Sequence, residues 1–230
     1  MADKVTAIVL AAGKGSRMNS DIPKQYLTLL GKPVLFYSLQ AFEESNVDEI
    51  VLVTGSGEQG YCKKEIVDKY HIKKVMHIVE GGAERYLSVH CGLLAATGAD
   101  YVLIHDGARP LVSTTVINEA IRSVKETGAC VVGMPVKDTI QLVDEKQDIV
   151  STPIRKQTWL AQTPQCFSYE LAMSSYNKVI EAKDADITDD AMVVQRYGNA
   201  KVRMLEGSYE NIKVTTPEDI LVAECFLKMR

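Results

Sequence analysis

Short apolar runs rich in β-branched residues recur along the chain and predict five strands. They lie at residues 6–10 (TAIVL), 49–53 (EIVLV), 74–79 (KVMHIV), 101–105 (YVLIH) and 129–134 (ACVVGM). A run of this length that is apolar throughout is typical of a strand buried on both faces of a sheet.

Segments with helical periodicity separate several of these runs. The segment PVLFYSLQAFEES offers Pro33 as a first helical residue and repeats apolar residues three and four apart. The segment STTVINEAIRSVKETG begins with cap-type residues at Ser113 and ends at Gly128. Strands that alternate with helices predict an α/β fold: a Rossmann-like, doubly wound, mainly parallel sheet covered on both faces.

The alternation breaks between residues 137 and 157. The segments DTIQLV and DIVSTPI are strand-like and flank the charged turn DEKQ, which predicts a protruding β-hairpin arm. A two-stranded hairpin of mixed polarity is poorly stabilised alone, so we expect the arm to pack against another surface, for which a second subunit is a candidate. No repeat or interdomain linker is evident, and we interpret residues 1–230 as a single domain that includes this arm.

Composition and charge exclude several classes of protein. The 230 residues are 46% hydrophobic and 24% charged, which suits an ordinary globular core. A formal net charge of −4 argues against a general nucleic-acid binder, which would need a broad basic face to bind phosphates. No apolar segment approaches the roughly 20 residues that cross a bilayer, and the short N-terminal run indicates a buried strand rather than a signal peptide. The 5 cysteines are scattered and form no C-x-x-C pair, which favours a reducing cytoplasm over a disulfide framework or a zinc site.

Three unusual loops follow predicted strands. AAGKGSRM follows the first strand, EGGAERYLS the third and DGARP the fourth. Because ligands of open α/β sheets bind beyond the carboxyl ends of the strands, we expect these loops to meet at one edge of the sheet.

The first loop has the composition of a phosphate-binding turn. Gly13 and Gly15 allow close approach of a ligand, and successive amide N–H groups in such a turn form an anion-binding concavity. Arg17 and Lys24 add two cations. The Walker pattern is absent, and Met18 stands where a G-x-G-x-x-G motif needs its third glycine. The plainer alternative is that the glycines only turn the chain and that the two cations are solvated surface charges.

The later loops offer charged residues whose roles the residues alone leave open. Asp106 and Arg109 could bind a ligand, or they could pair with each other or cap a helix. We interpret His105 as the last strand residue rather than a catalyst. Thr188, in ITDDAM, could contact a ligand, or Thr188 or Asp189 could merely cap the helix DAMVVQRYG. Lys213, in NIKVTTPEDI, is expected on a short apolar strand before a capped helix, pointing either to a ligand or outward.

Taken in order, several motifs resemble those of one enzyme family over nearly the whole chain. LAAGKGSRM, PKQYL, GGAERYLSV, HDGARP, TPIRKQTWLAQTPQCF, TDDAM and EGSYENIKVTTPEDI resemble the 2-C-methyl-D-erythritol 4-phosphate cytidylyltransferases of the non-mevalonate pathway of isoprene biosynthesis. The ribitol-5-phosphate cytidylyltransferases share the first loop, QTPQ and NIKVTTP, but TWLAQTPQ together with HDGARP favours the methylerythritol branch. A nucleotide-binding module that has lost turnover is a further alternative.

The resemblance implies a transferase with the nucleotidyltransferase fold, acting in the cytoplasm as a homodimer joined through the arm at 137–157. It implies in-line transfer of CMP from CTP to 2-C-methyl-D-erythritol 4-phosphate, giving 4-diphosphocytidyl-2-C-methyl-D-erythritol and pyrophosphate, with Mg²⁺ as cofactor and without nucleic acid or membrane partners. The implied catalytic residues are Arg17, Lys24 and Lys213. The implied substrate-binding residues are Ala11, Ala12, Gly13, Gly82 and Ser88 for cytidine, and Asp106, Arg109, Arg155 and Thr188 for the sugar phosphate, with Arg155 reaching across from the other subunit. No protein ligand is assigned to the metal.

Two positions depart from the family pattern. Ala83 stands where some members carry an acid, so only a backbone contact to the nucleotide is carried over there. Gly107 replaces the common alanine of HDAARP, a change that we expect to loosen the turn without harm. A phosphomonoester is largely a dianion at neutral pH because its second pKa is about 6, so this chemistry needs no general base. The loops accordingly offer cations rather than an evident Ser-His or Cys-His pair.

Overall fold

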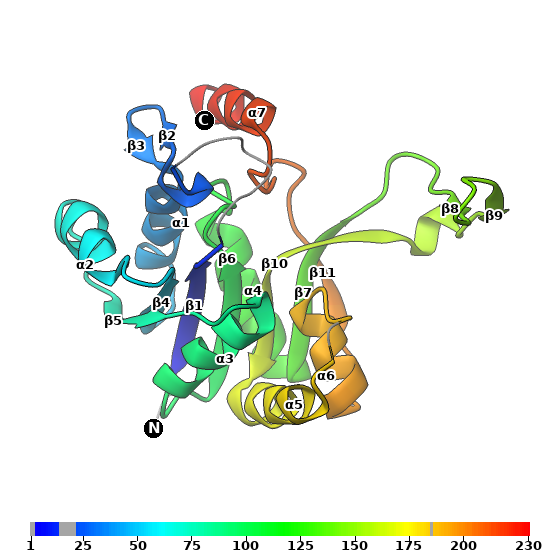
Figure 1. The fold of residues 1–230 in the computed structure, drawn as a ribbon, viewed down its shortest axis with the longest axis horizontal. Helices are drawn as coiled ribbons and strands as arrows, with labels where there is room; N and C mark the ends of the chain where they lie inside the picture. Colours follow the sequence, from blue (N-terminus) through cyan, green and yellow to red (C-terminus); the bar gives the residue numbers. More distant parts are fainter. Residues whose placement is uncertain (1–2, 14–21, 185) are drawn as a thin grey trace.

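The computed structural model describes residues 3–13, 22–184 and 186–230, and within these residues a seven-stranded sheet forms the centre of the molecule (Figure 1). Its strands are β1 (Val5–Ala11), β4 (Glu49–Thr54), β5 (Val75–Glu80), β6 (Tyr101–Asp106), β7 (Ala129–Pro135), β10 (Trp159–Ser168) and β11 (Arg203–Glu206). Their order in space is β11-β7-β10-β6-β1-β4-β5. β10 runs antiparallel to both of its neighbours, and the other pairs are parallel. The expected mainly parallel α/β sheet is confirmed.

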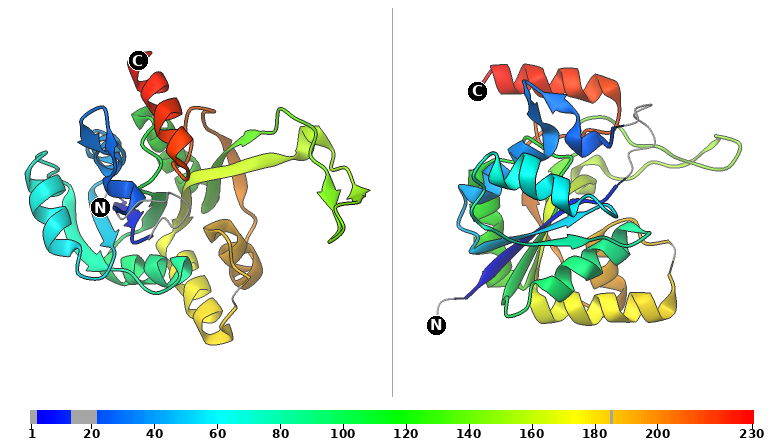
Figure 2. Two further views of the ribbon diagram at one scale, coloured as in Figure 1. Left: turned by 45° about the horizontal axis from the view of Figure 1, so that its top comes forward. Right: turned by 60° about the vertical axis from the view of Figure 1, so that its left-hand side comes forward.

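Helices cover both faces of this sheet (Figure 2). They are α1 (Val34–Glu43), α2 (Gln59–Tyr61), the π-helical turn η3 (Cys62–Asp68), α3 (Arg85–Ala95), α4 (Thr114–Thr127), α5 (Tyr169–Ala182) and α6 (Asp190–Gly198). The C-terminal helix α7 (Pro217–Lys228) packs instead in a separate cluster with Leu29 and Val34. Successive side chains of a strand face opposite sides, so Ala7 of β1 packs in one core cluster with Leu39 of α1. Its neighbour Ile8 packs in a second cluster with Leu93 of α3. The inner parallel strands β1, β4 and β6 are therefore buried on both faces, which explains why they are largely apolar.

Helix ends follow the capping chemistry of the sequence. The Ser113 side chain accepts a hydrogen bond from the Val116 amide at the start of α4, and Gly128 ends that helix in the left-handed conformation with φ of 73°. At α6 the cap is Asp189, whose side chain accepts from the Met192 amide, so the helix-capping alternative holds for that residue. Pro33 precedes α1 rather than forming its first residue.

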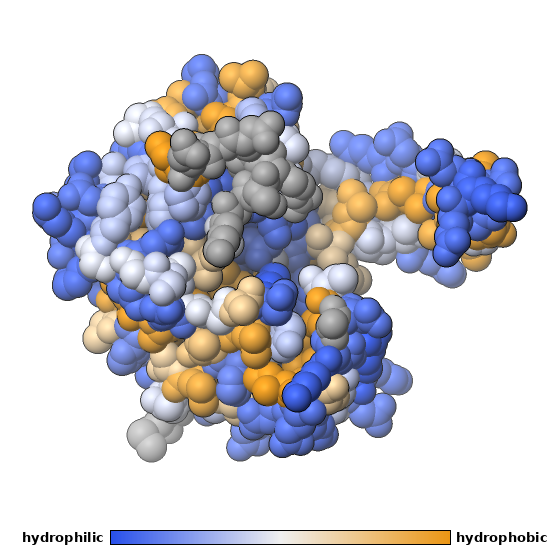
Figure 3. Space-filling model, viewed as in Figure 1, coloured by the Kyte–Doolittle hydropathy of each residue, from blue (hydrophilic) through white to orange (hydrophobic). Residues whose placement is uncertain are grey.

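The hairpin arm is present and projects from the sheet (Figure 1). Its strands β8 (Leu142–Val143) and β9 (Ile149–Ser151) pair antiparallel, and the short helix η4 (Arg155–Gln157) follows. Apolar side chains on the arm are open to solvent, among them Leu142, Val143, Ile149, Val150 and Ile154, of which Ile149 and Ile154 are each 64% exposed. Figure 3 shows this apolar surface along the arm. The described part of this chain does not cover it.

Small elements also lie between β1 and α1 in the chain. They are the 3-10 turn η2 (Lys24–Tyr26) and the two-stranded ribbon of β2 (Thr28–Leu29) and β3 (Lys32–Pro33). Among the described residues, no helix has both the length and the apolar character that crossing a membrane requires.

The structure corrects the expectation for the segment around Lys213. Residues 211–215 form no strand. The segment lies instead beside the loop after β6, where the Val214 amide donates to the Ala108 carbonyl over 2.8 Å. The apolar alternation around Lys213 predicted a strand, but a strand also needs a neighbouring strand with a free edge. The neighbour here is β6, which is already paired on both sides.

Candidate functional site

A pocket of about 1040 Å³ lies at the edge of the sheet where β1, β5 and β6 end. The described residues that line it are Leu10, Ala12, Gly13, Pro23, Lys24, Gln25, Gly55, Ser56, Glu58, Glu80, Gly81, Gly82, Ala83, Glu84, Arg85, Ser88, Asp106, Ala108 and Lys213. The three loops that the sequence analysis expected at one edge of the sheet therefore meet there.

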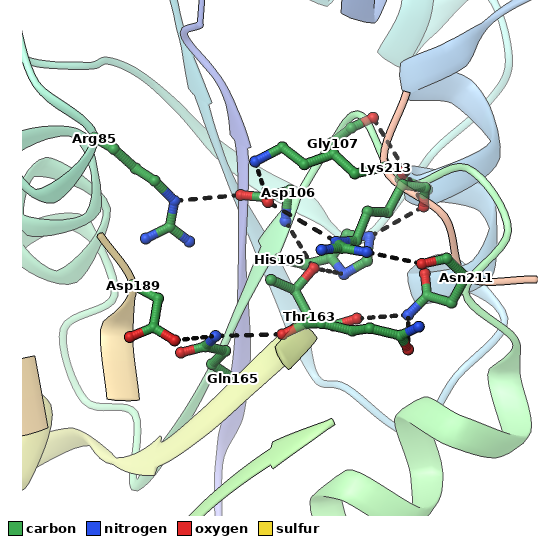
Figure 4. A network of polar contacts seen from close by, with 12 residues as sticks. Arg85, His105, Asp106, Gly107, Thr163, Gln165, Asp189, Asn211 and Lys213 are labelled. Carbon is green, nitrogen blue, oxygen red and sulfur yellow. Dashed lines mark hydrogen bonds and ion pairs between the residues drawn. The ribbon is translucent and has the colours of Figure 1, made fainter. Parts of the chain in front are cut away.

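Asp106, the last residue of β6, lies among three cations (Figure 4). Its Oδ1 is 3.3 Å from Arg85 Nε, and its Oδ2 is 2.8 Å from Lys213 Nζ. Arg109 Nε is more distant, 3.9 Å from Oδ2. Burial alone raises the pKa of the Asp106 carboxyl, but the charges of Arg85, Lys213 and Arg109 outweigh burial and hold this pKa well below its usual range. Asp106 is therefore a fixed negative charge inside a cationic cluster.

A hydrogen-bonded chain holds the backbone of Asp106. The Asp106 amide donates to Thr163 Oγ1 over 3.2 Å, and Thr163 Oγ1 lies 2.9 Å from His105 Nδ1. Because the Arg109 carbonyl can only accept, His105 Nε2, 3.2 Å away, carries the proton and donates to it. In the neutral ring Nδ1 is then the acceptor for the Thr163 hydroxyl proton. This arrangement requires a neutral ring, and burial lowers the pKa of His105 to about 4. His105 lies within β6, one position before its end, as a structural residue.

Lys213 reaches Asp106 because its segment is anchored on both sides. Asn211 Nδ2 donates to the Thr163 carbonyl over 2.9 Å, and Arg109 Nη1 donates to the Asn211 carbonyl over 2.8 Å. These bonds and the Val214 contact hold the chain across the end of β6. Lys213 points into the pocket, so the alternative of an outward-facing strand lysine is wrong.

The loop of Gly81 and Gly82 after β5, called the glycine loop, packs tightly against the end of β1 and against α3. A Cβ at Gly81 would lie 2.7 Å from both Ala12 Cβ and Ser88 Oγ. At the next residue, a Cβ on Gly82 would lie 2.4 Å from Leu87 Cβ. Only glycine allows the loop to approach α3 and the end of β1 this closely, so the pair defines the shape of the pocket.

Gly107 is also held in close contact. A Cβ there would lie 2.7 Å from Leu35 Cδ1 and 2.9 Å from the Leu10 carbonyl oxygen. The Gly107 amide donates to that same carbonyl over 2.8 Å, and its carbonyl accepts from Ser38 Oγ. Glycine at this position thus suits a tightly packed turn, which corrects the expectation that it only loosens the turn.

The residues singled out from the sequence are distributed unevenly around this pocket. Ala12, Gly13, Lys24, Gly82, Ser88, Asp106 and Lys213 line it, as does Ala83. Ala11 faces the core at 2% exposure, and its carbonyl accepts a 2.6 Å hydrogen bond from Gln25. Arg109 lies beside Asp106 just behind the pocket lining. Arg17 and Gly15 lie outside the described residues.

Two further residues lie apart from the pocket lining of their own chain. Arg155 is exposed on η4 of the arm. Thr188 is exposed ahead of α6, where its hydroxyl contacts Met192 Sδ at 3.7 Å.

Sequence reasoning gave no role to three residues that the structure brings to the site: Arg85, Thr163 and Asp190. Each lies inside a motif that had been noticed, namely GGAER, QTPQ and TDDAM. The usable signal was a charged or hydroxyl residue inside a glycine- or proline-marked loop. Their partners, however, lie far away in the sequence: Arg85 pairs with Asp190 across 105 residues and Thr163 with His105 across 58.

Comparisons with known proteins support a family assignment. The family model described as 2-C-methyl-D-erythritol 4-phosphate cytidylyltransferase matches residues 5–229. A relative of that name from Lachnoclostridium phytofermentans is 50% identical over 98% of this chain and 97% of its own length. Another of that name, from Lachnospira eligens, is 50% identical over 97% of this chain and 99% of its own length.

Solved structures agree with the sequence relatives. The 4-diphosphocytidyl-2C-methyl-D-erythritol synthase of Anaerococcus prevotii superposes with a TM-score of 0.87 at 32% identity, covering 98% of this chain and 96% of that one. The 2-C-methyl-D-erythritol 4-phosphate cytidylyltransferase of Thermus thermophilus gives a TM-score of 0.78 at 28% identity, covering 96% and 98%. The chain therefore belongs to the 2-C-methyl-D-erythritol 4-phosphate cytidylyltransferase family.

Proposed function

We propose that this protein transfers CMP from CTP to 2-C-methyl-D-erythritol 4-phosphate and releases pyrophosphate. The observation that carries the proposal is Asp106 held between Arg85 and Lys213 in a pocket that the tight glycine loop and Lys24 also line. Such a pocket suits two phosphate-bearing substrates, one on each side of a fixed carboxylate. The family assignment supports the same reaction.

The nucleotide is proposed to occupy the side of the pocket formed by the first loop and the glycine loop. Ala12, Gly13, Gly82 and Ser88 line that side and offer backbone groups for a base and ribose. Lys24 also lines the pocket, where it would hold the triphosphate together with Arg17. Ala11 would contribute through its backbone, since its side chain is in the core.

The acceptor is proposed to lie at Asp106 and Lys213. Asp106 would accept hydrogen bonds from the acceptor's hydroxyl groups, and Lys213 would bring its phosphate toward the nucleotide. Within the described part of the chain, Arg109 Nε is buried without a hydrogen-bond partner, which supports a role for Arg109 in neutralising charge next to the acceptor. Thr188 is a further proposed contact at the rim.

The chemistry needs placement and charge rather than a base. The attacking phosphate oxygen is already anionic near neutral pH, so it forms the new bond to the α-phosphorus while the bond from that phosphorus to the bridging oxygen of pyrophosphate breaks. The barrier is the approach of two polyanions and the growth of charge on the leaving group. Arg17 and Lys24 would stabilise that leaving group, and Lys213 would share charge in the transition state.

A divalent cation fits this donor set as a companion of the triphosphate. Among the described residues, no group of three or more His, Cys, Asp or Glu side chains is arranged to hold a metal ion. Mg²⁺ is usually bound through one or two carboxylates plus substrate phosphates and water. Both oxygens of Asp106 already contact a cation, Arg85 or Lys213, so the triphosphate itself would be the main ligand of Mg²⁺. Bound to the triphosphate, Mg²⁺ would supply neutralisation of the phosphate charge.

The arm supports a dimer. We propose that residues 1–230 form one domain and that residues 137–157 pair two subunits, because the arm exposes apolar side chains such as Ile149 and Ile154. Arg155 on the arm would then reach the acceptor phosphate in the partner's pocket. Mass measurement by light scattering tests the dimer, and an unchanged KM for the acceptor in Arg155→Ala would refute the cross-subunit contact. The five cysteines are free, in accord with the cytoplasm as the proposed location.

The test of the reaction is pyrophosphate release from CTP and Mg²⁺ with 2-C-methyl-D-erythritol 4-phosphate or ribitol 5-phosphate, measured side by side. A kcat/KM that favours the methylerythritol compound supports the proposal. A preference for ribitol phosphate would keep the mechanism and replace the acceptor. Tight CTP binding with no turnover on either acceptor would indicate a nucleotide-binding module.

A further inference from the structure

The guanidinium of Arg85 joins two carboxylates that come from different parts of the fold. Arg85 is the first residue of α3 and directly follows the glycine loop. Its Nη1 and Nη2 donate to the two oxygens of Asp190 over 2.7 and 2.8 Å. Its Nε donates to Asp106 Oδ1 over 3.3 Å. Figure 4 shows Arg85 pointing toward Asp106 from the side opposite Asn211.

Asp190 is itself held rigidly. It is fully buried in the first turn of α6, and the Tyr176 hydroxyl of α5 donates to its Oδ1. The next residue is docked as well, because the Ala191 amide donates to Gln165 Oε1 of β10 over 2.7 Å. A bidentate pair between a fixed carboxylate and a planar guanidinium leaves the guanidinium little freedom. The direction of Arg85 Nε is therefore determined by Asp190.

This arrangement divides the two oxygens of Asp106. Arg85 engages Oδ1, so Oδ2 is the oxygen that faces Lys213 at 2.8 Å. Arg85, which is not among the residues proposed to contact a substrate, thus sets the orientation of the Asp106 carboxylate. The position of the Lys213 ammonium follows from that orientation.

The formal charges also indicate that Asp190 is needed to keep Arg85 in place. Arg85, Arg109 and Lys213 contribute three positive charges, and Asp106 and Asp190 two negative ones, which leaves a formal charge of +1. Arg85 lines the pocket and its side chain is 31% exposed. Without Asp190, Arg85 would be free to turn toward Asp106 Oδ2 or toward a substrate phosphate, and the cluster would carry one more positive charge.

We propose that Arg85, Asp190 and Tyr176 form a positioning network that fixes the orientation of Asp106 for the acceptor substrate. The network extends from α5 through α6 and α3 to the end of β6. The inference rests on the proposed function, since the acceptor is the substrate placed at Asp106. The competing interpretation is a buried ion pair that only stabilises the fold, and buried pairs alone are weak evidence for either role.

The test compares Asp190→Asn, Arg85→Lys and Tyr176→Phe with Arg196→Gln as the matched control. Arg196 makes a 2.7 Å ion pair with Asp184 at the far end of α6, away from the pocket. The readouts are kcat and KM for each substrate, the Kd for CTP alone by calorimetry, and the urea midpoint. Arg85→Lys keeps the charge, but an ammonium cannot span Asp190 and Asp106 as a guanidinium does.

Asp190→Asn and Arg85→Lys are expected to lower kcat/KM for the acceptor roughly tenfold, mainly through KM, with the Kd for CTP within about twofold of wild type. Tyr176→Phe removes one hydrogen bond to Asp190 and is expected to lower it roughly threefold. Arg196→Gln is expected to match wild type in both kinetic readouts.

Variants that lose urea stability but keep wild-type kcat/KM and KM for the acceptor would overturn the network in favour of a structural pair. An equal loss of CTP affinity would also overturn it, because the effect would then belong to the whole pocket. Should Asp190→Asn fail to fold, Arg85→Lys and Tyr176→Phe decide the question.

A crystal structure of Arg85→Lys gives a readout that needs no turnover. A rotated Asp106 carboxylate with a lost or lengthened contact to Lys213 supports the inference. An unmoved Asp106 refutes it even if the wild-type protein is active, whereas a wild-type protein without turnover refutes the proposed function instead.

Discussion

Thr163→Val is the most direct perturbation of the chain that holds Asp106. Valine keeps the branched shape of threonine and removes only the hydroxyl. The hydroxyl oxygen accepts a 3.2 Å hydrogen bond from the Asp106 amide and lies 2.9 Å from His105 Nδ1. Thr163 is buried at 3% exposure, so water has little access to replace it.

The expected loss of stability follows from the two polar groups left without a partner, the Asp106 amide and His105 Nδ1. A buried donor or acceptor without a hydrogen bond costs about 1–3 kcal/mol. Because the surrounding structure can adjust and recover part of this loss, we expect the two groups together to lower the free energy of unfolding by about 2–4 kcal/mol. In a chain of this size each kcal/mol lowers Tm by roughly 2–4 °C. We also expect a higher KM for the acceptor, because Asp106 loses a backbone anchor.

Urea unfolding followed by circular dichroism at constant m value measures the stability loss, and pyrophosphate release measures the KM. The matched control is Thr127→Val, the same change at the partly exposed end of α4, where the hydroxyl donates to the Ser123 carbonyl over 2.8 Å. That carbonyl can turn to water, so the control is expected to lose less than about 1 kcal/mol. If Thr163→Val loses no more than the control and the acceptor KM is unchanged, the hydrogen-bonded chain does not hold Asp106.

Three further outcomes are expected. Lys213→Met removes the cation nearest to Asp106, 2.8 Å away, and should lower kcat/KM for the acceptor roughly 10- to 150-fold, the equivalent of one charge-assisted hydrogen bond; a loss below about threefold in pyrophosphate release contradicts this role. The pKa of His105 is lowered by burial from 6.5 to about 4, so the unfolded chain takes up the proton first as pH falls. Stability should be complete above pH 6.5 and decline by about 3 kcal/mol down to pH 4 in urea titrations, and an equal decline in His105→Gln would rule this residue out as the cause. Gly81→Ala would place a methyl 2.7 Å from Ser88 Oγ and should weaken CTP binding at least roughly tenfold in calorimetry, whereas wild-type affinity would show that the loop yields freely.

The hydrophobic pattern predicted the central strands because parallel strands buried on both faces are apolar at every position. The hydrophobic pattern did not predict β10, because the buried half of this strand includes the polar residues Gln162, Thr163 and Gln165. Those side chains are tolerated because each finds a partner elsewhere: the Ser208 carbonyl, His105 and the Ala191 amide. Polar residues that are buried for hydrogen bonding give no periodic signal, so the strand next to the site was the hardest to predict.

The loops of the site could be predicted, but their pairings could not. A strand followed by glycines or by an acid places the loop at the sheet edge, which located Gly82 and Asp106 correctly beside one pocket. The direction of Lys213 depends on Asn211, which is fixed by Thr163 some 48 residues earlier. Apolar alternation around Lys213 suggested a strand, whereas the long-range hydrogen bonds determine where the ammonium lies.

A carboxylate in the middle of the proposed phosphate-binding pocket looks unfavourable, because Asp106 would repel the phosphates of the proposed substrates. The three cations around it give the reason for its presence. Without Asp106, Arg85, Arg109 and Lys213 would repel one another in a partly buried site, and Lys213 would lose the contact that holds its ammonium. With it, they are held at defined positions, and their remaining positive charge is available to a phosphate in the proposed site. The repulsion of a phosphate by Asp106 is lessened because the charges of Arg85, Lys213 and Arg109 offset that of the carboxylate. The same cations outweigh the effect of burial and hold the pKa of Asp106 well below its usual range, so the carboxyl stays ionised and keeps them in place. Preorganised charge of this kind requires no rearrangement at the moment of reaction, which is the property that electrostatic catalysis of phosphoryl and nucleotidyl transfer needs most.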